Sequence, residues 1–127
     1  MSKIRLDGSS SFENLCRAYK NLDRSLATPV AEPRDLSGII KDFEMVYELS
    51  WKVLKKRLLA DGHQTQGARD VFAKGYQLGF INDQSVWLEM IDDRNNAAHV
   101  YDEASAQKIV DRVRAKYHAV FAATFDV

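Results

Sequence analysis

The sequence predicts an all-α protein, most simply an up-and-down antiparallel bundle of four to five helices. Along most of its 127 residues, apolar side chains recur three and four positions apart, which is the spacing of one face of a helix. No segment shows sustained alternation of polar and apolar residues with β-branched enrichment. No Asn-Gly or Asp-Gly turn separates two such runs, since Asp61-Gly62 follows a helical pattern instead. Short loops between the helical segments suit antiparallel neighbours.

The first helix is predicted to run from about Ser10 to Ala27. Ser10 followed by Glu13 is a capping-box pair, which satisfies backbone N–H groups at a helix start. The apolar residues that then recur at helical spacing are Phe12, Leu15, Tyr19, Leu22 and Leu26. Residues 28–34 hold both prolines of the chain and are predicted to form a loop, because proline lacks an N–H donor and disfavours helix in the residue before it.

The second predicted helix is the central one. Asp35 or Ser37 is expected to cap it, and Gly62 to end it. Its apolar residues spread well beyond a single stripe: Ile39, Ile40, Phe43, Met45, Val46, Tyr47, Leu49, Trp51, Val53, Leu54 and Leu58. A helix apolar over so much of its circumference is expected to touch neighbours on several sides, or a second subunit.

Three further helices are predicted. One spans residues 66–78 and is closed by Gly79 in a left-handed conformation. The next is capped by Asn82 or Asp83, and the residues that recur along it are Trp87, Met90, Ile91, Arg94 and Ala98. The last begins at Asp102 and runs almost to the C-terminus, with one face made of Ala106, Ile109, Val113, Tyr117, Val120 and Thr124, and with Val110 and Phe121 near it.

Composition limits the classes of protein to which the chain can belong. Its length fits one domain, expected to span residues 1–127. Eighteen Lys and Arg balance eighteen Asp and Glu, so no global positive field attracts nucleic acid, and any RNA contact must be local. The single Cys16 cannot form an internal disulfide, and the N-terminus has no apolar run of the kind found in signal peptides. Charges interrupt the apolar segment 39–59, so we expect a cytoplasmic protein without a membrane span.

Residues 92–101 (DDRNNAAHVY) are the stretch richest in chemistry, placed where two predicted helices meet. The guanidinium of Arg94 could bind a phosphate through two hydrogen bonds, and the imidazole of His99 could move a proton near neutral pH. The same two side chains could equally be cations that complement a helix end.

Spacing alone does not single out this stretch, because Arg57 to His63 and Arg112 to His118 show a similar pattern. Six steps in a regular helix turn Arg112 and His118 about 240° apart, so that pair is not expected to converge. The other pair straddles Gly62 at a helix end, where both side chains most simply complement the dipole. Arg94 differs because it projects from a face that is otherwise apolar.

A partly buried Arg94 needs a polar partner, and Asp92 and Asp93 are the nearby candidates. An alternative interpretation therefore stays open, in which Arg94 forms a purely structural ion pair with an aspartate and His99 has no function. Glu48 is expected to be solvated or paired with Lys52, one turn further along its helix.

Other chemistries are not supported by the residues present. Three scattered His and one Cys give no cluster at metal-ligand spacing, and no cofactor is expected. Residues 75–79 lack the following Lys-Ser/Thr of a phosphate loop, and no nucleotidyltransferase motif is present. A basic row on the last helix, formed by Lys108, Arg112 and Lys116, is either ordinary surface or the lining of an RNA groove.

Three motifs together resemble the HEPN proteins, in the branch of nucleotidyltransferase substrate-binding proteins that is grouped with HepT-type toxins. They are residues 43–52 (FEMVYELSWK), residues 79–81 (GFI) followed by 87–90 (WLEM), and above all residues 94–101 (RNNAAHVY), which match the Arg-x4-His-x-Tyr form of the family. The resemblance covers nearly the whole chain. Residues 66–69 (QGAR) depart from it, because relatives often open the third helix with Ser-Pro.

The resemblance implies a helical bundle that forms a homodimer, with Arg and His of both subunits lining a cleft. It also implies a separately encoded partner, a small nucleotidyltransferase of the MNT type. In a toxin of this kind Arg94 would hold the scissile phosphate of RNA, and His99 would act as general acid and base for metal-independent attack by the 2′-OH. Asn95 would support them, and Tyr101 would be the hydroxyl to which the partner adds AMP, which silences the nuclease.

Two other interpretations remain open from the sequence. The protein could be a non-catalytic subunit that presents a substrate to the nucleotidyltransferase, with Arg94 and His99 gripping a nucleotide phosphate. It could also be a purely structural helical dimer without a ligand.

Overall fold

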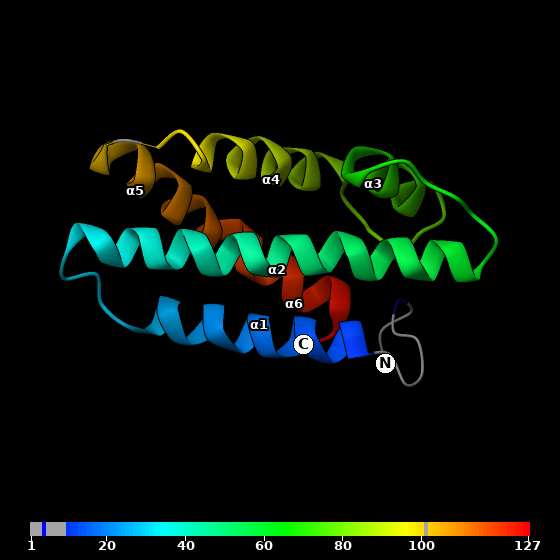
Figure 1. Cartoon of the computed structure of the whole chain (residues 1–127), viewed down its shortest axis with the longest axis horizontal. Helices are drawn as coiled ribbons and strands as arrows, with labels where there is room; N and C mark the ends of the chain where they lie inside the picture. The colour runs from blue at the N-terminus through cyan, green and yellow to red at the C-terminus, as the bar shows by residue number, and fades with distance from the viewer. Residues whose placement is uncertain (1–3, 5–9, 101) are drawn as a thin grey trace.

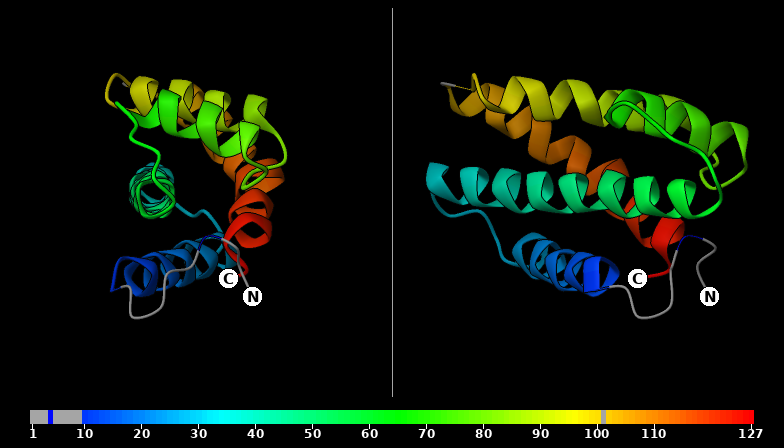
Figure 2. Two further views of the ribbon diagram at one scale, coloured as in Figure 1. Left: turned by 90° about the vertical axis from the view of Figure 1, so that its right-hand side faces the viewer. Right: turned by 45° about the vertical axis from the view of Figure 1, so that its right-hand side comes forward.

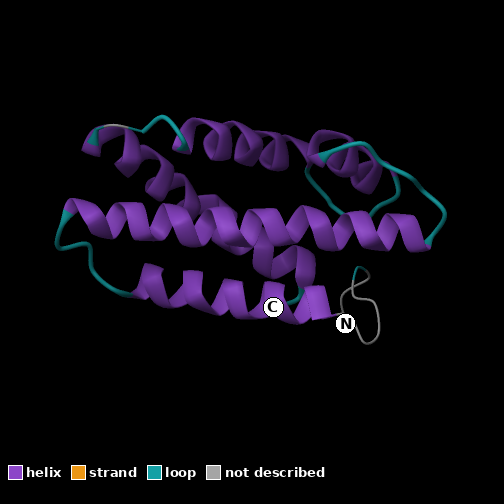
Figure 3. Cartoon of the chain, in the orientation of Figure 1, coloured by secondary structure: helices purple, strands orange, loops and turns teal. Residues whose placement is uncertain are grey.

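The structure is a computed structural model, and it describes residue 4 and residues 10–100 and 102–127. Within that part of the chain all regular structure is helical, so the predicted all-α bundle is confirmed (Figure 3). The helices are α1 (Ser10–Ala27), α2 (Pro33–Ala60), α3 (Ala68–Gln77), α4 (Gln84–Ala97), α5 (Glu103–Arg112), a π-helical turn η1 (Val113–Tyr117) and α6 (His118–Phe125).

Helix α2 lies at the centre of the bundle, as its broad apolar surface predicts. It packs against α1 on one side and against α3, α4 and α5 on the other (Figures 1 and 2). Ten of its side chains are buried, among them the fully enclosed Phe43 and Val46. These contacts on both sides of α2 hold α4, which carries the candidate site, in a fixed place relative to the rest of the core.

The start of α2 differs from the prediction. The helix begins at Pro33, and Asp35 lies in its first turn instead of capping it. Proline suits a first turn because the N–H that it lacks would have no partner within the helix. The Asp35 carboxylate accepts hydrogen bonds from the backbone N–H groups of Ala31 and Glu32, both at 2.9 Å. These bonds stabilise the charged form and lower the pKa of Asp35 below its usual value.

Helix α3 is slightly shorter than predicted, starting at Ala68 and not at Gln66. Gly79 follows it at φ +82°, so the predicted left-handed closure is confirmed. Gly75 has a separate role, because a Cβ atom added there would lie 2.9 Å from Cδ2 of Leu54 on α2. Its missing side chain lets α3 approach the central helix closely.

The structure selects Asp83 from the two predicted caps of α4, Asn82 and Asp83, and confirms Asp102 at the start of α5. Asp83 accepts a hydrogen bond from the backbone N–H of Ser85 at the start of α4, at 2.9 Å. Asp102 accepts from the backbone N–H of Ser105 at the start of α5, at 2.7 Å. The loop between α4 and α5 is therefore fixed on the side of α5 by a side chain as well as by packing.

The last helix is continuous but not regular. Between α5 and α6 the backbone N–H of His118 bonds the carbonyl of Val113, five residues back, which is a π turn. Beyond it Phe121 and Phe125 are buried, whereas Val120 and Thr124 are only half-buried. The face predicted for the end of this helix is thus wrong, because the prediction assumed a constant α-helical rotation.

Aromatic rings from α2, α3, α4, η1 and α6 contact one another in the core. The Trp87 ring of α4 lies 4.8 Å from the ring of Phe72 and 5.7 Å from that of Phe121, measured between centroids. The Phe43 ring lies 5.4 Å from that of Tyr117. These contacts fix the inner face of α4 against α3 and α6, and the opposite face is left for the polar residues.

Two buried tyrosines predict loss of stability at alkaline pH. Burial raises the pKa of Tyr47 from 10.0 to about 12, and burial together with the nearby Asp93 raises that of Tyr117 well above its usual value. Above pH about 10 the unfolded chain releases tyrosine protons that the folded protein keeps, so the free energy of unfolding falls as the pH rises. Urea unfolding between about pH 9 and about pH 11 should show a smaller fall in the free energy of unfolding for Tyr47→Phe than for wild type.

The exposed Tyr76 supplies the control for this measurement, since half of its surface is in contact with solvent. Tyr76→Phe is expected to keep the wild-type pH dependence. An equal alkaline slope in wild type and in Tyr47→Phe would contradict the assignment.

None of the helices in the described part of the chain combines the length and the apolar character that a membrane span requires.

Candidate functional site

Arg94 lies in the last full turn of α4, and its partner is a glutamate on α2. Its Nε donates to Oε1 of Glu48 at 3.0 Å, and the other carboxylate oxygen of Glu48 accepts from Nε1 of Trp51 at 3.1 Å. The expectation that Asp92 or Asp93 pairs with Arg94 is therefore wrong, and so is the pairing of Glu48 with Lys52. Arg94 keeps 38% of its side-chain surface exposed, so its remaining N–H groups are open to an anion.

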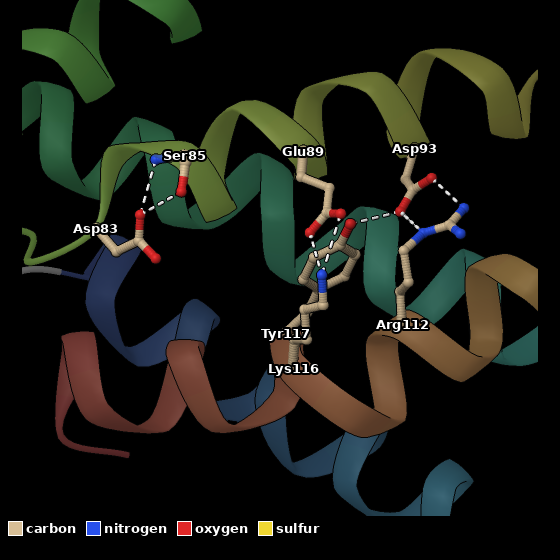
Figure 4. A network of polar contacts seen from close by, with 7 residues as sticks. All are labelled: Asp83, Ser85, Glu89, Asp93, Arg112, Lys116 and Tyr117. Carbon is tan, nitrogen blue, oxygen red and sulfur yellow. Dashed lines mark hydrogen bonds and ion pairs between the residues drawn. The ribbon is translucent and has the colours of Figure 1, made fainter.

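Asp93 instead faces the last helix, where it forms the most buried ion pair among the described residues (Figure 4). Arg112 donates from Nε and Nη2 to the two carboxylate oxygens of Asp93, both at 2.7 Å. The hydroxyl of Tyr117 donates to the same carboxylate at 2.5 Å. These bonds raise the pKa of the Arg112 guanidinium and lock it in one orientation.

The π turn makes this arrangement possible. Five residues separate Arg112 from Tyr117, and in a regular α-helix they would point about 140° apart. The i to i+5 hydrogen bond of the π turn instead brings residues five apart to the same side. Both side chains therefore reach Asp93, a convergence that a regular helical projection of the sequence does not predict.

A surface pocket of about 320 Å³ opens between the end of α4 and α5, and we call it the α4–α5 pocket. Its polar lining consists of Asp93, Asn96, His99, Ser105, Lys108 and Arg112. Asp93 and Asn96 lie three positions apart on α4, and His99 follows three positions later in the turn after the helix. Lys108 and Arg112 lie one turn apart on α5. Two cations, a carboxylate, an amide, a hydroxyl and an imidazole thus surround one opening.

The predicted site residues do not all meet in one chain. His99 lines the α4–α5 pocket, whereas Arg94 and Asn95 do not line it. Arg94 faces α2 through Glu48, about 100° around α4 from Asp93. Asn95 is exposed at the end of the helix. Tyr101 lies outside the described residues.

The other two Arg and His pairs do not form sites, as predicted. Arg57 pairs with Asp61 in the last turn of α2, at 3.3 Å. Nε2 of His118 lies 2.8 Å from Oδ1 of Asp23 and 3.0 Å from the hydroxyl of Tyr19, so it links the last helix to α1. In the described part of the chain, no three His, Cys, Asp or Glu side chains gather as a metal site requires.

Sequence reasoning missed the contribution of Asp93, Asn96 and Lys108 to the surroundings of His99. Lys108 and Arg112 were visible in the sequence as part of a basic row. What joined them to His99 is the antiparallel return of the last helix along α4, which the sequence predicts only in outline (Figure 1).

Comparison with known proteins identifies the family. The family described as nucleotidyltransferase substrate binding protein like matches residues 10–126. The chain belongs to this family. Over 83 residues it is 34% identical to the protein of Haemophilus influenzae named Probable ribonuclease HepT, and the match covers 61% of this chain and 57% of that relative's length. The chain thus spans a little over half of the relative that it matches.

A solved structure shows the same fold. The Haemophilus influenzae protein HI0074, described as having the fold of a substrate binding domain of a nucleotidyltransferase, superimposes with a TM-score of 0.81 at 24% identity. The match covers 91% of this chain and 96% of that one. The family and these two relatives together support the HepT-like branch of the HEPN proteins, which the sequence motifs resemble.

Proposed function

We propose that the protein is a HEPN-type toxin that cleaves RNA without a metal ion. The observation that carries the proposal is the placing of His99 in a cationic pocket, one turn beyond a half-exposed Arg94. The similarity to a protein named as a probable ribonuclease supports it. In this proposal residues 1–127 form one HEPN-like domain.

The proposed reaction follows from the chemistry of these side chains. Arg94 binds the scissile phosphate through its free N–H groups, and Asn95 supports this contact. His99 takes the proton of the adjacent 2′-OH, and the resulting alkoxide attacks phosphorus while the P–O5′ bond breaks. The products are a 2′,3′-cyclic phosphate and a 5′-OH end, and the proton ends on the leaving oxygen.

A homodimer completes the proposed site, because Arg94 and His99 do not share a pocket in one chain. Helix α2 offers the surface: Met45 keeps 56% of its area exposed, and the half-buried Leu49 lies one turn further, beside the Glu48 that binds Arg94. Exposed apolar residues flanked by polar ones are typical of interfaces. A dimer through this face brings the Arg94 surfaces of two chains towards one cleft.

The proposed regulator is a separately encoded MNT-type nucleotidyltransferase. The family's description in terms of nucleotidyltransferases supports such a partner. In this proposal it transfers AMP from ATP to the hydroxyl of Tyr101, two residues after His99: the Tyr101 oxygen bonds the α-phosphorus, the bond to the β-phosphate breaks, and pyrophosphate and the phenolic proton are released. The added nucleotide carries a negative charge and considerable bulk, and in this proposal it keeps RNA out.

The test is cleavage of an RNA oligonucleotide by the purified protein in EDTA. Wild type is expected to produce 2′,3′-cyclic phosphate ends, and Arg94→Ala is expected to cleave far more slowly. A substrate with a single 2′-deoxy sugar at the cleavage site should stay intact. Equal cleavage by wild type and Arg94→Ala would show a contaminating nuclease and end the proposal.

The second candidate function is a non-catalytic subunit that presents a substrate to the nucleotidyltransferase. The family description favours it, and so does the ion pair that already occupies one edge of Arg94. In that case RNA stays intact in every assay, while affinity for a nucleotide or for the partner falls in Arg94→Ala and His99→Ala. Whether RNA is cleaved therefore distinguishes the two candidate functions.

A further inference from the structure

We propose that the α4–α5 pocket is a second phosphate subsite, which binds an RNA phosphate next to the one that reacts. This inference rests on the proposed nuclease function and adds two residues to it, Lys108 and Arg112. Both line the pocket that also holds His99, whereas Arg94, the proposed ligand of the scissile phosphate, does not line it. When an RNA strand places the reacting 2′-OH at His99, a neighbouring phosphate of the strand therefore lies near Lys108 and Arg112.

Arg112 is built to present its free edge. Its Nε and Nη2 each give one bond to Asp93, and the Tyr117 hydroxyl also interacts with the guanidinium, which still leaves N–H groups of Arg112 for an outside acceptor. About a third of its side chain is exposed, whereas that of Asp93 is 6% exposed. Because the guanidinium is already immobilised by Asp93, an anion that binds its outer edge does not have to restrict the Arg112 side chain further, so the entropy cost of binding is small.

Lys108 adds a second cation to the pocket. Asp93 offsets Arg112, and Asp102 at the start of α5 interacts electrostatically with the exposed Lys108, but in residues 10–100 and 102–127 no carboxylate lies within ion-pair distance of that lysine. In contrast, Lys116, the third cation of the same helical row, is held by Glu89 at 2.9 Å. The pocket therefore offers, beside His99, an ammonium group that no described carboxylate holds in direct contact.

The size and the polar groups of the pocket fit a phosphate with part of its sugar. Its volume of about 320 Å³ equals the share of roughly ten water molecules in the liquid. The amide of Asn96 and the hydroxyl of Ser105 add neutral hydrogen-bonding groups to its wall. Such groups suit the ester oxygens and hydroxyls of a nucleotide better than an apolar ligand.

The experiment compares Lys108→Gln with Lys20→Gln, a control on the exposed side of α1. Binding to an uncleavable 2′-O-methyl RNA is measured by fluorescence anisotropy over a range of salt concentrations. For Lys108→Gln the slope of log K against log salt should be smaller by about 0.7, and Kd at low salt should be about tenfold higher. Lys108→Glu should weaken binding further, and Lys20→Gln should match wild type. Thermal melting checks that each variant is folded.

Cleavage then separates this inference from the proposed function. A second RNA carries a neutral methylphosphonate in place of the flanking phosphate. On this RNA, wild type should have the same raised KM that Lys108→Gln has on unmodified RNA. The KM of Lys108→Gln should be the same on both RNAs. If wild type cleaves RNA but Lys108→Gln binds and cleaves equally well, the subsite is overturned and the nuclease stands. If no RNA is cleaved but the difference in binding remains, the nuclease fails and the phosphate site stands.

Discussion

Replacement of His99 by alanine is expected to reduce the rate of RNA cleavage by about 100-fold to 10,000-fold, which is the usual contribution of a general acid or base. The side chain is exposed and lines the α4–α5 pocket, so its loss removes proton transfer without opening the core. The effect should fall on kcat, because substrate binding depends mainly on the cations around it. Single-turnover cleavage of an RNA oligonucleotide in EDTA measures it directly.

His63→Ala is the matched control for this prediction. His63 lies in the loop after α2 and is partly exposed. The end of α2 and the connection between α4 and α5 lie at opposite ends of the bundle (Figure 1). Its replacement should leave cleavage unchanged. If His99→Ala keeps the wild-type kcat, the imidazole has no part in proton transfer. If it also binds RNA tenfold more weakly, His99 is a binding residue only.

Replacement of Arg112 by methionine is expected to lower the free energy of unfolding by about 3 kcal/mol, near the lower end of the cost of breaking a buried ion pair. The carboxylate of Asp93, which is 6% exposed, loses two charge-assisted bonds and keeps that of Tyr117. The partial exposure of Arg112 places the expected cost at the lower end of that range. For a chain of this length the melting temperature should fall by about 10 °C.

Two further variants make this prediction specific. Arg17→Met, on the exposed face of α1, should change stability by less than about 0.5 kcal/mol. Adding Asp93→Asn to Arg112→Met removes the unpaired charge and should recover part of the loss. A double variant no more stable than Arg112→Met would show that packing of the arginine stem, and not the ion pair, carries the effect.

Signals confined to a few residues predicted the local features of the fold well. The caps Asp83 and Asp102 each act on the residue two or three positions further on, and Gly79 terminates its own helix. Such interactions are encoded within one turn, so a single sequence is enough to find them. The central place of α2 follows in the same way from its apolar circumference.

The partners of the site residues could not be predicted because they are distant in the chain. Glu48 binds Arg94 across 46 positions, and Asp93 binds Arg112 across 19. Neighbouring carboxylates looked sufficient in the sequence, but the α-helix turns Asp93 about 100° away from Arg94. Which helix faces each of them is decided by the packing of the whole bundle.

The π turn also leaves a trace in the spacing of the apolar residues after it. Val113, Tyr117, Phe121 and Phe125 are all buried and lie four positions apart. In a regular α-helix the directions of Val113 and Phe125 around the axis would differ by about 120°, so such a row would turn away from the core. One extra residue in the turn reduces this difference to about 20°. An uninterrupted run of apolar residues at intervals of four is therefore a mark of a widened turn, and the same turn places Tyr117 beside Asp93.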